Sequence, residues 1–368
     1  MVVGSGIRPV LRSWTALVPA AAALALLLSW GRELTHGVAV VVAALIAGAV
    51  VAAVHHAEVV AARVGEPFGS LVLAVAVTVI EVGLIVTLMV SGGEKAASLA
   101  RDTVFAAVMI TANGIVGLSL LSGSLRRRVA VFNREGTSAA LGAVATLATL
   151  TMVLPTFTTT APGPQFSGGQ IAFAAVASLL VYLLWARVQT VRHRDYFLPI
   201  TTEGQVVTAE QHAAPPSTKT TLVSLGLLVL SLIAVVGDAK AVSPSIERVV
   251  AAIGWPQRVV GVAIALIVLA PETIAAMRAA RRDRIQTSLN LAYGSAMASI
   301  GLTIPAIAVA SIWLSGPLIL GLEPTQLVLL AITVVAGILT VVPGRATPLQ
   351  GGVHLSILAA FLFLAVAP

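Results

Sequence analysis

Charged side chains are scarce in this sequence. Only 10% of its 368 residues are Asp, Glu, Lys or Arg, whereas a soluble domain carries about 25%. The charges gather in short clusters, and apolar runs of about 20 residues separate them, which is long enough to cross a bilayer. These features exclude a soluble enzyme, a secreted disulfide scaffold and a disordered tail. They predict an all-α integral membrane protein.

Several chemical motifs are also missing. Cysteine is absent, which removes disulfides and thiolate metal sites. The sequence has no His-Glu-x-x-His zinc motif and no nucleotide-binding domain, and its four Asp residues are expected at the ends of spans, where they could not serve an aspartyl intramembrane protease. We therefore expect no enzymatic activity and no cofactor. The net charge of +7 does not indicate nucleic acid, because basic loops beside lipid explain it.

The apolar runs predict eleven transmembrane helices, near residues 14–30, 37–60, 68–91, 101–123, 137–157, 170–190, 220–238, 257–278, 285–314, 324–343 and 351–367. A polar connection at 192–219 indicates a linker between six spans and five. With a cytoplasmic N-terminus, 16 of the 22 Lys and Arg residues fall on the cytoplasmic side. The positive-inside rule then predicts a multi-pass protein of the cell inner (plasma) membrane, with its C-terminus outside.

A short duplication relates the two parts of the chain. The segment at 58–67 recurs at 247–256, with matching Glu, Gly and Pro residues at a constant offset of 189. Five spans separate the copies, and because five is odd, they have opposite orientations in the membrane. We predict an extra N-terminal helix at 1–36, a five-helix repeat at 37–191, the linker at 192–219 and an inverted five-helix repeat at 220–368. Chance similarity of Ala/Val-rich helices is the alternative.

Two carboxylates lie where lipid disfavours them. Glu81 and Glu272 are 191 residues apart, each within an apolar span, where an ionised carboxylate costs at least about 2.5–3.5 kcal/mol. A cation, a proton or a polar partner makes such a position tolerable, so both residues are candidate ion-binding and proton-binding groups. Pro271 precedes Glu272, and we expect it to interrupt the helix and free carbonyl oxygens for a cation. The alternative is a protonated Glu that is hydrogen-bonded inside the bundle.

Other polar residues are candidates for supporting roles. Hydroxyl and amide oxygens can coordinate a cation, although such residues also serve helix packing alone; the candidates are Thr78, Asn113, Ser295 and Ser299. A second group lies toward the ends of spans and could form a vestibule or a proton relay, with solvated helix ends and ordinary surface histidines as the alternatives; its members are Glu58, Glu66, Glu247, His55 and His56.

At these residues the sequence resembles the calcium/cation antiporter superfamily, and within it the bacterial calcium (sodium, potassium)/proton antiporters. The likeness rests on Gly65-Glu-Pro-Phe-Gly69 leading into Thr78-Val-Ile-Glu81, and on Pro271-Glu-Thr273 leading into the segment at 288–295. It implies that Glu81 and Glu272 are the paired ion-binding carboxylates, and that Asn113, Ser295 and Ser299 line the site. Ser245-Ile-Glu247 resembles a further motif of calcium/proton exchangers. Many calcium exchangers have Gly-Asn-Ala around the key Glu, which this chain lacks.

The resemblance implies a secondary transporter that exports Ca²⁺ from the cytoplasm in exchange for H⁺. Exchange of Na⁺ (or K⁺) for H⁺ on the same site stays open, because the missing Asn oxygens weaken the argument for Ca²⁺. A passive cation channel is a further alternative, since carboxylates also line pores. Inorganic cations, protons and membrane lipid are the expected partners, and nucleic acid is not.

Overall fold

The computed structural model describes residues 13–65, 68–92, 96–200, 215–313 and 316–368. Within them, ten helices are long and apolar enough to cross a membrane, and a shorter apolar helix, α2 (Trp14–Ser29), precedes them. The chain is thus an all-α, multi-pass membrane protein, as its composition predicted. The helices form two compact units, Met1–Ala96 with Gln211–Gln257, and Ala97–Glu210 with Arg258–Pro368.

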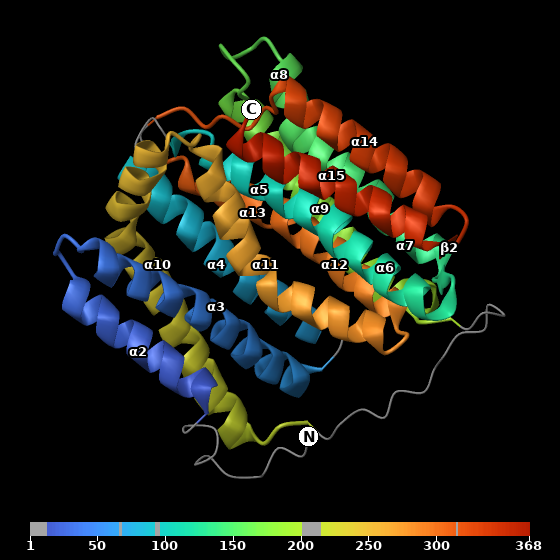
Figure 1. Cartoon of the computed structure of the whole chain (residues 1–368), viewed down its shortest axis with the longest axis horizontal. Coiled ribbons are helices and arrows are strands. Elements are labelled where there is room, and N and C mark those ends of the chain that lie inside the picture. Colours follow the sequence, from blue (N-terminus) through green and yellow to red (C-terminus); the bar gives the residue numbers. More distant parts are fainter. Residues whose placement is uncertain (1–12, 66–67, 93–95, 201–214, 314–315) are drawn as a thin grey trace. The chain divides into compact units, whose positions relative to one another are not determined.

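The first unit consists of α2, α3 (His36–Val64), α4 (Phe68–Gly92) and α10 (Thr218–Ile253). α3 and α10 pack against each other, and α2 and α4 each pack against both of them (Figure 1). Arg63 near the end of α3 donates hydrogen bonds to the carbonyl of Pro216 and the hydroxyl of Thr218, which lie at the start of α10. These two helices therefore run antiparallel.

The second unit holds the remaining helices. One long span is built from α5 (Leu99–Met109), the π-helical turn η2 (Ile110–Ile115) and α6 (Val116–Arg127). The next spans are α7 (Arg134–Ala148) with η3 (Thr149–Val153) and α8 (Leu154–Phe157), and α9 (Gly168–Arg187) with η4 (Val188–Arg192), followed by the short turn η5 (Arg194–Phe197). The last are α11 (Arg258–Arg281), α12 (Ile285–Gly301) with α13 (Thr303–Ala310), α14 (Pro324–Val341) and α15 (Pro348–Val366). Two short strands, β1 (Ala130–Val131) and β2 (Arg345–Ala346), pair antiparallel.

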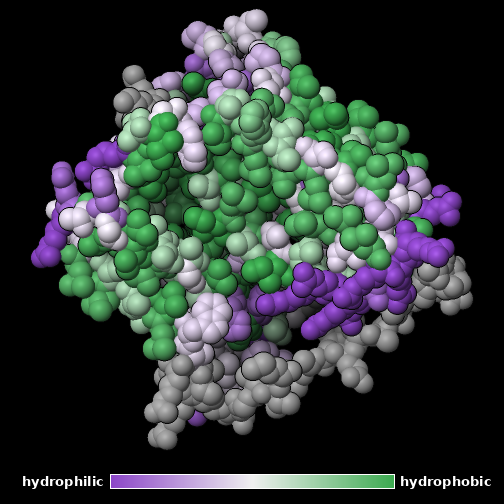
Figure 2. Space-filling model, in the orientation of Figure 1, coloured by the Kyte–Doolittle hydropathy of each residue, from purple (hydrophilic) through white to green (hydrophobic). Residues whose placement is uncertain are grey.

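Apolar side chains remain at the surface of both units. Leu27 on α2 is 76% exposed, and Leu349 and Phe363 on α15 are 73% and 68% exposed. Figure 2 shows hydrophobic residues over much of the face that it displays, with hydrophilic residues gathered in restricted patches. Such a surface is unfavourable in water and suits contact with lipid tails.

The structure corrects two expectations about the backbone. The span predicted at 220–238 does not end there, because α10 runs on to Ile253 and places Asp238 inside the helix rather than at its end. The predicted interruption at Pro271 is wrong, since α11 is continuous from Arg258 to Arg281. Proline removes only its own bond to the carbonyl of Ile267, and helices packed around a span tolerate that loss. Within the described residues, the backbone departs from the α-helix instead at the π-helical turns η2, η3 and η4 and at Leu302, between α12 and α13.

Two glycines occupy the same structural position in the segments that match in sequence. Gly65 ends α3 with φ of +76°, and Gly254 ends α10 with φ of +75°. Residues with a Cβ atom rarely adopt this conformation, so both positions favour glycine. The two glycines share a positive φ but differ in ψ, which is 170° at Gly65 and 21° at Gly254. The duplication, the boundaries of the repeats and the linker stay predictions. Residues 201–214 of that linker lie outside the described residues.

Candidate functional site

Glu81 lies in the interior of α4 and is only 2% exposed. Its neighbours Ile80, Leu84 and Ile85 are buried, and Thr78, one turn earlier, is buried as well. α4 approaches α10 closely at this level, because a Cβ atom placed on Gly83 would lie 2.5 Å from Cγ2 of Val236. In its middle, α4 therefore presents a buried carboxyl group and, one turn earlier, a buried hydroxyl group.

Glu272 lies in the interior of α11 and is 8% exposed. The hydroxyl of Thr273 donates a hydrogen bond of 2.7 Å to the carbonyl of Leu269. Pro271 has no N–H group, so the carbonyl of Ile267 lacks its usual helical donor. Even without a break in the helix, this turn thus offers a carboxylate and a carbonyl oxygen, which are ligands that hard cations prefer.

Asn113 sits in the π-helical turn η2 and is fully buried. Its amide nitrogen donates to the hydroxyl of Thr333 (2.9 Å), and its amide oxygen accepts from Nδ1 of His354 (3.1 Å). Nε2 of His354 lies 3.2 Å from the hydroxyl of Thr340. This network joins η2 to α14 and α15. π-Helical turns recur at functional sites, which makes this turn a candidate part of the transport machinery.

His354 is a functional candidate that the sequence did not reveal, although it carries a comparable signal. His354 is a lone titratable residue in the apolar helix α15 and is 1% exposed, which is the feature that identified Glu81 and Glu272. Its partners could not be anticipated, because Asn113 is 241 residues away in the sequence. Through its contact with the amide oxygen, His354 holds the side chain of Asn113 in position.

Ser295 and Ser299 lie on α12, where Ser299 is buried and Ser295 is half-buried. α12 packs against α11 and η2, so the second unit brings both serines onto helices that adjoin those of Glu272 and Asn113. The glycines around them serve packing: a Cβ atom on Gly301 would lie 2.6 Å from Cβ of Tyr182. Glu81 and Thr78 belong to the first unit.

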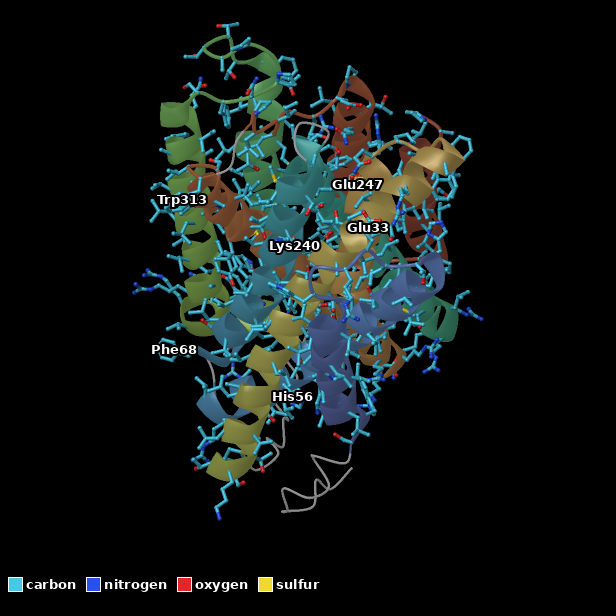
Figure 3. The ribbon with its side chains drawn as sticks, turned by 90° about the vertical axis from the view of Figure 1, so that its left-hand side faces the viewer. Glu33, His56, Phe68, Lys240, Glu247 and Trp313 are labelled. Atoms are coloured by element: carbon cyan, nitrogen blue, oxygen red, sulfur yellow. The ribbon has the colours of Figure 1, made fainter. Side chains whose placement is uncertain are left out.

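The candidate vestibule residues fall into two groups within the first unit. His56 is fully buried, and its Nε2 lies 2.9 Å from the carbonyl of Thr15, which links α3 to α2, whereas His55 and Glu58 are exposed. Glu247 accepts a hydrogen bond of 3.1 Å from Ser243, near the opposite end of α10 from the contact with α3 at Arg63. In Figure 3, Glu247 and His56 lie far apart accordingly. Glu66 lies outside the described residues.

Comparison with known proteins places this architecture. The family model "Sodium/calcium exchanger protein" matches residues 34–191 and 223–367. The protein y4hA of Sinorhizobium fredii is 48% identical over 89% of this chain and 88% of its own length, and the sodium-potassium/proton antiporter ChaA of Escherichia coli is 32% identical over 95% of each. The crystal structure of the Ca²⁺/H⁺ antiporter protein YfkE superposes with a TM-score of 0.68 over 97% of this chain and 100% of its own. At 15% identity, this last likeness shows the fold.

Proposed function

This chain belongs to the sodium/calcium exchanger family of cation transporters, and from that premise we propose that it exports Ca²⁺ from the cytoplasm in exchange for protons. The observation that carries the proposal is a pair of buried carboxyl groups, Glu81 and Glu272, each in the interior of an apolar helix. A buried carboxylate needs a counter-charge, and either a proton or a metal cation supplies it.

In this mechanism protons and the cation compete for the two carboxylates. Together they carry two negative charges, which one Ca²⁺ or two protons neutralise. Facing the cytoplasm, Ca²⁺ displaces the protons; facing outward, protons displace Ca²⁺. Two carboxylates without a proton or a cation are costly to carry through the membrane, so the two fluxes stay coupled. We place the protein in the inner membrane with its N-terminus in the cytoplasm, and we assign no resident cofactor.

Exchange of Na⁺ or K⁺ for protons is the second candidate. The relative from Escherichia coli bears that activity in its name. Ca²⁺ takes six to eight oxygen ligands, whereas Ile80 and Pro271, which precede the two glutamates, supply no side-chain oxygen. The amide of Asn113 is engaged by His354 and Thr333, which leaves less of it for a metal ion. This shortage of fixed oxygens is the reason why exchange of a monovalent cation is the second candidate.

Transport in everted membrane vesicles tests the proposal. Addition of Ca²⁺, Na⁺ or K⁺, each alone and over a pH series, reveals which cation releases protons that have accumulated inside. We expect Glu81→Gln and Glu272→Gln to reduce exchange to the level of vesicles without the protein. Glu135→Gln is the matched control, because Glu135 is an exposed residue paired with Arg134.

Two outcomes would contradict the proposal. Wild-type exchange in either glutamine variant of Glu81 or Glu272 would show that the site lies elsewhere. Cation flux that persists without any opposing movement of protons would indicate a passive channel.

A further inference from the structure

A third carboxyl group is buried in the interior of a helix. Asp238 on α10 is fully buried, and neither of its carboxyl oxygens has a hydrogen-bond partner within the part of the chain that the structure describes. Asp102, also buried, differs, because Arg101, Gln326 and Ser98 all donate hydrogen bonds to it. An unpartnered buried carboxylate is strongly disfavoured as an anion. Asp238 therefore needs a proton or a transient counter-charge.

The helices around α10 in the first unit offer few charges. α2 carries no titratable residue, and α4 carries Glu81 alone. The titratable residues of α3 are His36, His55, His56, Glu58 and Arg63, and those of α10 besides Asp238 are Lys219, Lys240, Glu247 and Arg248. The α10 residues one turn away from Asp238, Val235 and Val242, are buried and apolar. Among the described residues, no positively charged side chain is therefore bonded to Asp238.

Asp238 lies at nearly the same depth as Glu81. α3 runs antiparallel to α10. The N–H group of Gly69 donates a hydrogen bond to the carbonyl of Gly65, which keeps the end of α3 beside the start of α4, so these two packed helices are antiparallel as well. It follows that α4 and α10 are parallel. They touch where Gly83 meets Val236. Glu81 lies two residues before Gly83, and Asp238 lies two residues after Val236. At a rise of about 1.5 Å per residue, Glu81 and Asp238 are therefore about 6 Å apart along the helix axes.

A pocket in the first unit reaches the turn of α10 that carries Asp238. Gly237, Lys240 and Ala241 line one wall, and the end of α2 with residues 30–34 forms the other. Its volume of about 270 Å³ is ample for several water molecules. Glu33 and Lys240 lie at this pocket, toward the end of the unit away from His56 (Figure 3). The pocket, which has room for water that could accept a proton, thus reaches Gly237, the residue next to Asp238.

We propose that Asp238 binds and releases a proton in each exchange cycle, with the water of this pocket as the proton acceptor and donor. The O–H bond of the carboxyl group breaks, the proton passes to water, and the return step re-forms the same bond. The inference rests on the proposed antiport, in which Asp238 joins Glu81 and Glu272 as a third proton-binding group. From the sequence, Asp238 was expected at the end of a span and had no role in the predicted transport.

The test compares Asp238→Asn, which has the size of the protonated acid but cannot release a proton, with wild-type protein in proteoliposomes. We expect the pH midpoint of cation-driven proton movement to shift by about one unit or more. Infrared difference spectra upon addition of the cation should lose one carboxylic-acid C=O band. Asp238→Glu should retain both signals. If Asp238→Asn does not assemble, Asp238→Ser gives the same comparison because it also lacks the carboxyl group.

Asp283→Asn is the matched control, since Asp283 is exposed and paired with Arg127, and we expect it to match the wild type. A wild-type pH profile and unchanged carboxyl bands in Asp238→Asn would overturn the assignment of Asp238 alone, provided that Glu81→Gln is inactive. The antiport proposal fails differently: wild-type protein itself would then move no protons with any cation, and the assignment of Asp238 would fall with it.

Discussion

Replacement of Arg101 by Met should strongly destabilise the second unit. The Arg101 side chain is 5% exposed, and its Nε and Nη2 each lie 2.9 Å from Oδ1 of Asp102. Its Nη1 donates to the carbonyl of Gly321, and Nη2 pairs with Glu323 at 3.1 Å. Arg258 pairs with the other oxygen of Glu323 at 3.0 Å. One guanidinium group thus ties the start of α5 to the segment before α14.

The expected magnitude follows from what remains after the substitution. Asp102 is 4% exposed and would keep Gln326 (3.3 Å) and Ser98 (2.9 Å) as donors, but no positive partner. Removal of one partner of a buried ion pair costs about 3–5 kcal/mol. Because two donors remain, we expect the lower end, about 3 kcal/mol. The same change at Arg127, whose pair with Asp283 is 62% and 39% exposed, should cost about 0–1 kcal/mol.

Thermal unfolding of the detergent-solubilised protein measures both variants under identical conditions. The double variant Arg101→Met with Asp102→Asn should lose less stability than the two single variants together, because it also removes the uncompensated charge. Equal losses in Arg101→Met and Arg127→Met would refute the reasoning, as would full additivity in the double variant.

Two further substitutions have matched controls. Gly351→Ala should lower stability by about 1–3 kcal/mol in the same unfolding assay, because its Cβ atom would lie 2.8 Å from a backbone nitrogen of α6. Gly352→Ala has open space and should leave stability unchanged or raise it by up to about 1 kcal/mol. His354→Leu should cost about 1–3 kcal/mol, since it deprives the buried amide of Asn113 of a partner. His36→Leu, at an exposed position, should show no such loss, and an equal loss would argue against the network.

Hydropathy and charge identify the spans because lipid penalises both unpaired backbone and unpaired charge. They locate a span's end less well, as α10 shows. Asp238 and Lys240 resemble the charged edge of a membrane segment, yet the helix passes through both and buries the aspartate. Hydropathy sums side chains along one segment, and it cannot distinguish a carboxyl group in a loop from one that other helices enclose.

The same limit separates the features of the candidate site that the sequence could predict from those that it could not. Glu81 and Glu272 were identifiable because a lone carboxyl group in an apolar run is anomalous without reference to any other segment. The bonds of Asn113 depend on Thr333 and His354, which reach it from α14 and α15. The effect of Pro271 likewise depends on the packing around α11, which the residues near it in the sequence do not specify.

The number of protonatable groups decides whether membrane potential drives the exchange. If Ca²⁺ is the exported cation and only Glu81 and Glu272 exchange protons, two protons replace one Ca²⁺ and no net charge moves. A third proton on Asp238 would leave one elementary charge uncompensated in each cycle, which is worth about 2.3 kcal/mol per 100 mV. A potential that is negative inside would draw that proton inward and thereby favour export of Ca²⁺. On the proposal made for Asp238, this residue would couple transport to voltage, and its amide variant should exchange without net charge.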